Sequence, residues 1–120
     1  MTKFDMIIRG GTVVTASDTI RCDVGIKDEK IIALGEDLQD DTAKVIDAEG
    51  LLVMPGGVDS HVHIDQASGP GVVMADDFDT ATLSAMCGGN TTVIPFALQE
   101  KGQTLRSAVE DYHKKAEGKS

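Results

Sequence analysis

One short stretch constrains this chain more than any other, and it reads Pro55-Gly56-Gly57-Val58-Asp59-Ser60-His61-Val62-His63-Ile64-Asp65. An apolar run stops at two glycines, and polar and apolar residues then alternate. Because side chains of an extended strand alternate between its two faces, Asp59, His61 and His63 are predicted to share one face. Two imidazoles on one face can converge on a single metal ion such as zinc, whose histidine ligands lie at about 2.0–2.1 Å.

The position of this His-X-His pair strengthens what is otherwise a weak signal. After Met54 the chain reads as strand, loop, helix, strand, loop, helix, which is typical of the opening of a parallel α/β unit. Such folds build their sites at the carboxyl ends of strands. Asp59 is predicted to accept a hydrogen bond that orients an imidazole. The residues by themselves leave two interpretations open, a metal site or two idle histidines of the core or surface.

Residues 1–54 form a β-rich part of the sequence, with the candidate domain boundary near Met54 and Pro55. Short apolar runs alternate with polar turns at a spacing typical of a small antiparallel sheet or half of a sandwich. The predicted strands are residues 4–9, 12–15, 22–27, 31–34, 45–48 and 51–54, and residues 36–44 are a polar loop.

The second half, residues 55–120, contains two predicted helices. The first begins at Asp76-Asp77-Phe78, where acidic side chains suit the positive end of the helix dipole, and it ends at Gly88-Gly89. A buried type of strand follows over residues 91–96. The second helix begins after Thr104, a plausible N-cap, and Gly118 is predicted to end it.

Charge and composition exclude several classes of partner. The net charge is −9, with 20 acidic and 11 basic residues and no basic cluster. Nucleic acid and anionic membrane are therefore disfavoured, because both require clustered Lys and Arg. No apolar run approaches the roughly 20 residues of a membrane helix, and no signal-peptide core is visible. Cys22 and Cys87 show no motif spacing, so we expect two small buried side chains in a reducing cytoplasm.

The sequence also resembles a known family. Gly-Gly-Val-Asp-Ser-His-Val-His, at 56–63, resembles the metal-binding opening of the amidohydrolase superfamily. Other segments resemble the hydantoinase and dihydropyrimidinase family, and the set covers nearly all 120 residues. These segments are residues 6–14, 23–26, 45–50 and 53–57, with 76–78 and 87–92 falling at that family's first barrel helix and second strand.

This resemblance implies an α/β architecture in two parts. Residues 1–54 would be the N-terminal part of a β-sandwich, which strands from the far C-terminus complete in the family. Residues 55–120 would be the first two β/α units of a metal-dependent (β/α)8 barrel. Because such a barrel alone needs roughly 200–250 residues, we expect an N-terminal fragment that is inactive by itself.

The resemblance further implies the chemistry. His61 and His63 would hold the more buried of two divalent ions, most simply Zn²⁺, which a carboxylated lysine bridges in the family. That lysine and the remaining ligands would lie outside this segment. The activity implied is metal-assisted hydrolysis of a cyclic ureide, such as a hydantoin or dihydropyrimidine, by a homotetramer. The family's loop after the second histidine often carries bulky apolar residues, whereas residues 66–71 here are small and polar, with Ser68 a candidate substrate contact.

Three rival interpretations remain at this point. An allantoinase or a dihydroorotase shares the His-X-His pair and differs in residues outside this segment. A non-catalytic relative that acts in assembly lacks the metal ligands, and the presence of both histidines argues against it. An independent β-rich binding module would fold cooperatively as a monomer, whereas unpaired barrel strands would leave exposed apolar edges.

Overall fold

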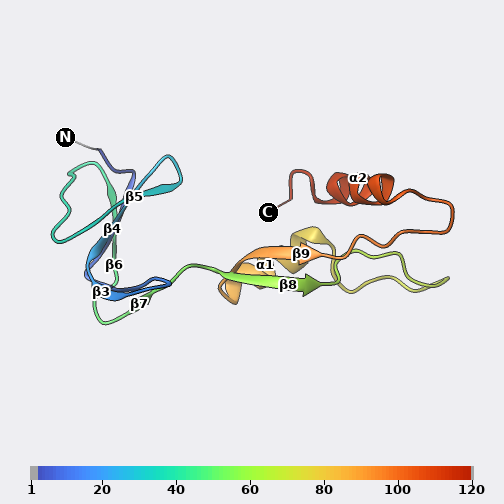
Figure 1. The fold of residues 1–120 in the computed structure, drawn as a ribbon, viewed down its shortest axis with the longest axis horizontal. Helices are drawn as coiled ribbons and strands as arrows, with labels where there is room; N and C mark the ends of the chain where they lie inside the picture. The colour runs from blue at the N-terminus through green and yellow to red at the C-terminus, as the bar shows by residue number, and fades with distance from the viewer. Residues whose placement is uncertain (1–2, 120) are drawn as a thin grey trace. The chain divides into compact units, whose positions relative to one another are not determined.

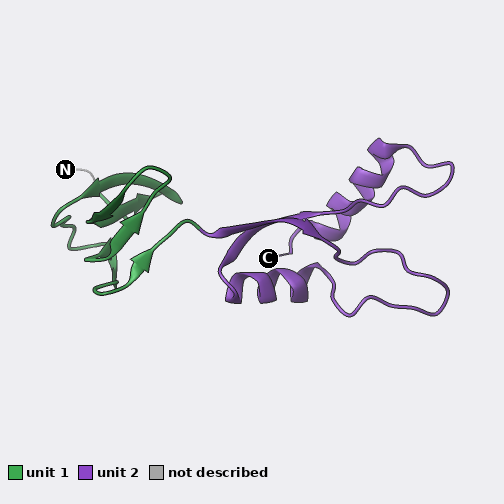
Figure 2. Cartoon of the chain, turned by 60° about the horizontal axis from the view of Figure 1, so that its bottom comes forward, with its two compact units in different colours: residues 1–55 green, residues 56–120 purple. Residues whose placement is uncertain are grey.

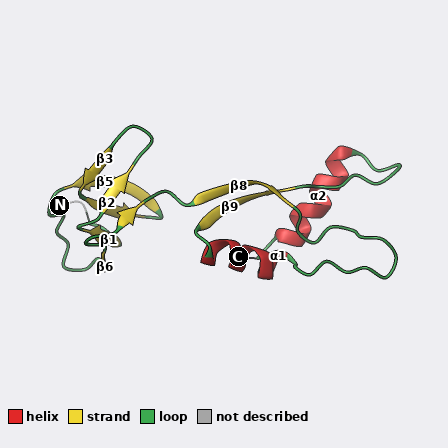
Figure 3. Ribbon diagram, turned by 90° about the horizontal axis from the view of Figure 1, so that it is seen from below, coloured by secondary structure: helices red, strands yellow, loops and turns green. Residues whose placement is uncertain are grey.

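A computed structural model describes residues 3–119, which divide between Pro55 and Gly56 into two compact units (Figures 1 and 2). The first unit is built of strands alone, and the second combines strands with helices (Figure 3). A strand-rich α/β chain is thus confirmed. No helix among residues 3–119 has the length and apolar character needed to cross a membrane.

Two sheets make up the first unit. The larger has the order β5-β4-β1-β6 and the smaller the order β3-β2-β7. Their strands are β1 (Met6–Arg9), β2 (Thr12–Val14), β3 (Thr19–Arg21), β4 (Asp23–Lys27), β5 (Lys30–Gly35), β6 (Lys44–Asp47) and β7 (Leu52–Val53). Pairing between β1 and β6 and between β2 and β7 is parallel, so the prediction of an antiparallel sheet was only partly right. The remaining pairs of these sheets are antiparallel.

The first unit is held together by a small apolar core. Val13, Cys22 and Val24 are buried together, and Ile7 is 0% exposed. Gly25 admits the ring of Phe4, because a Cβ at this glycine would lie 2.4 Å from a ring carbon. The buried carboxylate of Asp23 offsets its loss of water by accepting hydrogen bonds from two backbone N–H groups, those of Gly10 and Leu38, at 2.8 and 3.0 Å.

The second unit opens with a parallel strand pair. Strand β8 (Gly57–Val62) pairs with β9 (Asn90–Pro95), and helix α1 (Phe78–Cys87) connects them. This β-α-β connection is the parallel unit that the sequence predicts. Helix α2 (Leu105–Ala116) follows β9 and buries Ala108. Large apolar side chains of the strand pair and its continuation remain exposed, among them Val58, Ile94 and Phe96.

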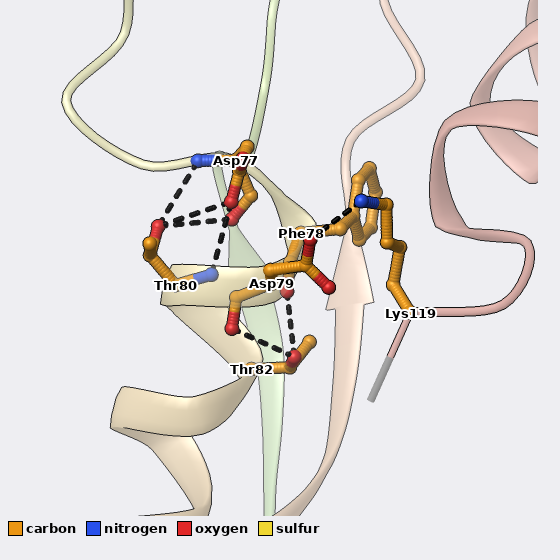
Figure 4. A network of polar contacts seen from close by, with 6 residues as sticks. All are labelled: Asp77, Phe78, Asp79, Thr80, Thr82 and Lys119. Atoms are coloured by element: carbon orange, nitrogen blue, oxygen red, sulfur yellow. Dashed lines mark hydrogen bonds and ion pairs between the residues drawn. The ribbon is translucent and has the colours of Figure 1, made fainter.

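Both helices begin at the predicted caps. At α1, the Asp77 carboxylate accepts from the Thr80 backbone N–H at 3.0 Å, and the Thr80 hydroxyl accepts from the Asp77 N–H at 3.2 Å (Figure 4). The hydrogen bond from the Thr80 backbone lowers the pKa of the Asp77 carboxyl, because it favours the charged form. At α2, Thr104 accepts from the Ser107 N–H at 3.1 Å. Lys119 reaches back to Asp79 in the first turn of α1 (Figure 4).

Two details differ from the sequence prediction. Strand β3 lies in a segment that was not predicted as a strand, because its three residues are too few to show periodicity. Cys22 is buried as expected, but Cys87 is exposed, so the prediction of two buried cysteines was wrong for the second. Cys87 is the last residue of α1, where the helix meets Gly88 and solvent.

Candidate metal centre

The two predicted histidines lie at the carboxyl end of β8. His61 is the penultimate residue of the strand, and His63 follows its last residue, Val62. The pairing of β8 with β9 is irregular between Asp59 and Val62, which is the segment that carries His61. Both imidazoles are exposed and turn toward each other, with their Nε2 atoms 3.3 Å apart.

This separation fits a shared metal ion. Two nitrogens that are each about 2.0–2.1 Å from a tetrahedral zinc lie about 3.3–3.4 Å apart. The observed 3.3 Å between the Nε2 atoms of His61 and His63 matches this spacing. The same distance also allows one imidazole to donate a hydrogen bond to the other. A metal ion would replace that shared proton, since histidine binds metals through an unprotonated nitrogen.

Phe96 supports both imidazoles from the neighbouring strand. It follows β9 directly, and its N–H donates to the Val62 carbonyl at 3.1 Å, which continues the strand pairing. Its ring stacks on His63, with an angle of 5° between the ring planes and 5.1 Å between the ring centroids. The centroid of the His61 ring lies 4.5 Å from that of Phe96. The ring thus limits rotation of both imidazoles on one side. The sequence identified this residue only as part of a strand.

Gln66 contacts the imidazole of His63 on the side away from His61. Its Oε1 lies 2.8 Å from His63 Nδ1, and its Nε2 donates to the Phe96 carbonyl at 3.1 Å. Asp59, the residue predicted to orient an imidazole, instead accepts from the backbone N–H of His61 at 3.2 Å. The side chain that touches a ring nitrogen is therefore an amide three residues after the second histidine.

Asp65 connects this segment to helix α2. Its carboxylate lies 3.4 Å from Lys115 Nζ, and the same ammonium donates to its carbonyl. Asp65 has φ of 46°, a left-handed conformation that Asp tolerates better than most residues. Burial raises the pKa of the Tyr112 phenol, and the negative charge of Asp65 raises it further. Through its two contacts with Lys115, Asp65, the residue before Gln66, is anchored to helix α2.

The loop from Gln66 to Asp76 is closed at its base by a 3.3 Å backbone hydrogen bond from the Asp65 N–H to the Asp76 carbonyl. Ser68, the candidate substrate contact, is exposed in this loop, with its hydroxyl 3.5 Å from the Gln66 carbonyl. It does not join the two histidines in any contact recorded for residues 3–119.

His61 and His63 by themselves would supply only two of the four ligands of a tetrahedral zinc site. Within residues 3–119, no group of three or more His, Cys, Asp or Glu side chains could hold a metal ion. Zinc takes four ligands, so two more would have to come from water, substrate or protein outside the described residues. The spacing of the two Nε2 atoms is compatible with one metal ion, which would need further ligands.

Comparison with known proteins places the chain in a family. The profile of the amidohydrolase family matches residues 44–109, a range that includes both histidines and the β8-α1-β9 connection. The chain belongs to the amidohydrolase family.

Individual relatives are similar over the whole chain. The D-hydantoinase of Geobacillus stearothermophilus is 47% identical over 120 residues, which are 100% of this chain and 25% of that protein. An allantoinase of Escherichia coli is 40% identical over 98% of this chain and 25% of its own length. The chain thus spans about a quarter of the length of these curated relatives.

Solved structures agree with this similarity. A crystal structure of D-hydantoinase matches with a TM-score of 0.90 and 48% identity, over 96% of this chain and 25% of that one. The dihydropyrimidinase from Brevibacillus agri NCHU1002 matches with a TM-score of 0.88 and 50% identity, again over 96% and 25%. The described fold is therefore that of the matching quarter of these enzymes.

Proposed function

We propose that the protein carrying this chain is a metal-dependent hydrolase that opens the cyclic amide ring of hydantoins or dihydropyrimidines. The observation that carries the proposal is the 3.3 Å separation of the His61 and His63 Nε2 atoms at the carboxyl end of β8. The similarity to D-hydantoinases and a dihydropyrimidinase supplies the substrate class. A relative that acts only in assembly would have no need of converging imidazoles.

In this proposal His61 and His63 hold one metal ion through their Nε2 atoms. The bound metal would act as a Lewis acid, which polarises a carbonyl and favours ionisation of water near neutral pH. Phe96 stacks on His63 and packs at a tilt against His61, so that little order has to be gained when the ion binds. We propose Zn²⁺ as the ion, with a second ion bridged by a carboxylated lysine outside these residues.

The proposed architecture follows the same relatives. Residues 1–54 would contribute to a β-sandwich, and residues 55–120 would be the first two units of a (β/α)8 barrel. The exposed apolar side chains of Val58 and Ile94, 61% and 53% accessible, are consistent with a strand pair that further barrel elements cover. Ser68 would face the substrate from its loop. The intact enzyme would be a cytoplasmic homotetramer.

Allantoinase is the second candidate activity, and the 40% identity to the Escherichia coli enzymes favours it. Turnover of hydantoin, dihydrouracil, allantoin and dihydroorotate by the purified gene product separates these candidates. We expect ring opening of hydantoin or dihydrouracil to be fastest. Preferential turnover of allantoin would transfer the assignment to the second candidate, and no metal-dependent turnover of any of the four would refute both.

A further inference from the structure

We propose that Gln66 is a positioning residue that fixes the tautomer and the ring orientation of His63, and so prepares its Nε2 atom to bind metal. The inference rests on the proposed function only in naming a metal as the ligand. It is carried by two hydrogen bonds of one amide, 2.8 Å to His63 Nδ1 and 3.1 Å to the Phe96 carbonyl.

The orientation of the amide follows from its partners. The Phe96 carbonyl can only accept a hydrogen bond, so the Gln66 atom that faces it is the NH₂ group. The opposite atom, Oε1, therefore faces His63, and this oxygen can only accept. Because an oxygen at 2.8 Å from Nδ1 needs a proton between them, His63 carries its proton on Nδ1.

The tautomer has a direct consequence for metal binding. In a neutral imidazole with Nδ1 protonated, the lone pair lies on Nε2, the atom that faces His61 at 3.3 Å. Metal-binding histidines generally donate their second N–H to a carboxylate, carbonyl or water, which fixes the ring and raises its basicity. Here a neutral side-chain amide takes that place, and it donates to the carbonyl of Phe96, the residue directly after β9.

Phe96 thus holds the His63 ring in two ways, directly through its own ring and indirectly through Gln66. The Phe96 ring stacks on the imidazole face, and the Phe96 carbonyl fixes the amide that binds its edge. Lys115 anchors the preceding Asp65 from helix α2. Each of these contacts belongs to residues 56–120, a single compact unit.

The test compares Gln66→Leu with Gln66→Glu in the gene product that carries this chain. Leucine keeps the approximate volume and removes the acceptor, whereas glutamate keeps an acceptor for Nδ1–H but loses the donor to the Phe96 carbonyl. Gln39→Leu is the matched control, because it makes the same chemical change at an exposed position of the first unit. Zn²⁺ affinity is measured by competition with a chelating dye, and the His63 tautomer of the metal-free protein by ¹⁵N NMR.

We expect Gln66→Leu to weaken Zn²⁺ binding by about 10–100-fold, Gln66→Glu to weaken it less than Gln66→Leu does, and Gln39→Leu to retain it. Metal-free wild type is expected to show the Nδ1–H tautomer at His63, and Gln66→Leu to lose that preference. Equal Zn²⁺ affinity of wild type and Gln66→Leu, or an Nε2–H tautomer in wild type, would overturn the proposal. If none of the four cyclic substrates is turned over, the proposed activity is refuted, but the Zn²⁺ affinity and the His63 tautomer still test the role of Gln66.

Discussion

The close approach of β8 and β9 at their start gives a sharp prediction about the two glycines before the histidines. A Cβ at Gly56 would lie 2.1 Å from Thr91 Oγ1 and 2.7 Å from Thr91 Cβ. Rotation about χ1 moves the γ atoms of threonine but leaves Cβ in place. Gly56→Ala therefore forces the two backbones apart, an overpacking that costs typically about 1–3 kcal/mol.

Gly57 provides the matched control in the same strand pair. A Cβ there would also lie 2.1 Å from a neighbour, but this neighbour is the Asn90 amide oxygen, and Asn90 Cα is 3.6 Å away. Rotation of the Asn90 side chain relieves the clash. We expect Gly57→Ala to change the free energy of unfolding by no more than about 0.5 kcal/mol.

Urea unfolding of the gene product with each substitution measures the difference. Gly56→Ala is expected to lower the midpoint with an unchanged slope, and Gly57→Ala to leave it near wild type. In a Thr91→Gly background the Gly56→Ala penalty should largely disappear, because the clashing Cβ is gone. Equal effects of the two alanine substitutions, or full additivity with Thr91→Gly, would refute the reasoning.

Two further predictions concern the first unit. Ile7→Ala leaves a cavity at a fully buried site and should destabilise the protein by about 2–5 kcal/mol, whereas Ile7→Val should cost about 0.5–1.5 kcal/mol. Equal melting temperatures of these two variants would contradict this prediction. Hydrogen bonds from Thr42 and Phe4 lower the pKa of Asp40 to about 2 from 3.8, so its stabilisation is present above pH 3.8 and is lost as the pH falls through about 2. Melting of wild type and Asp40→Asn should therefore converge between pH 4 and pH 2, and a constant difference would count against this role.

The sequence predicts the second unit well because its signals are local. Alternation over residues 58–64 places His61 and His63 together, and the structure brings their Nε2 atoms to 3.3 Å. Asp77 and Thr104 cap the two helices as expected, since a capping side chain acts on backbone groups only three residues away.

What the sequence could not supply are contacts between distant residues. The Phe96 ring meets imidazoles more than thirty residues earlier, and only the parallel pairing of β8 with β9 brings them together. A rule that adjacent parallel strands end at the same edge of a sheet would have pointed to it. Gln66 lay in a loop where no periodicity applies, so its contact with His63 depends on the loop's path. Strands β6 and β7 were both predicted, but their parallel pairing with β1 and β2 was not, because the sequence of one strand does not specify its partner or its register.

The central claim is that His61 and His63 together hold a metal ion, and metal retention tests it most directly. The gene product, its His61→Ala variant and a His113→Ala control are loaded with Zn²⁺, dialysed against a weak chelator and analysed for bound metal. His113 is exposed on helix α2 and serves as a histidine away from the pair. We predict that wild type and His113→Ala retain the ion and that His61→Ala loses it. Full retention by His61→Ala would contradict the account.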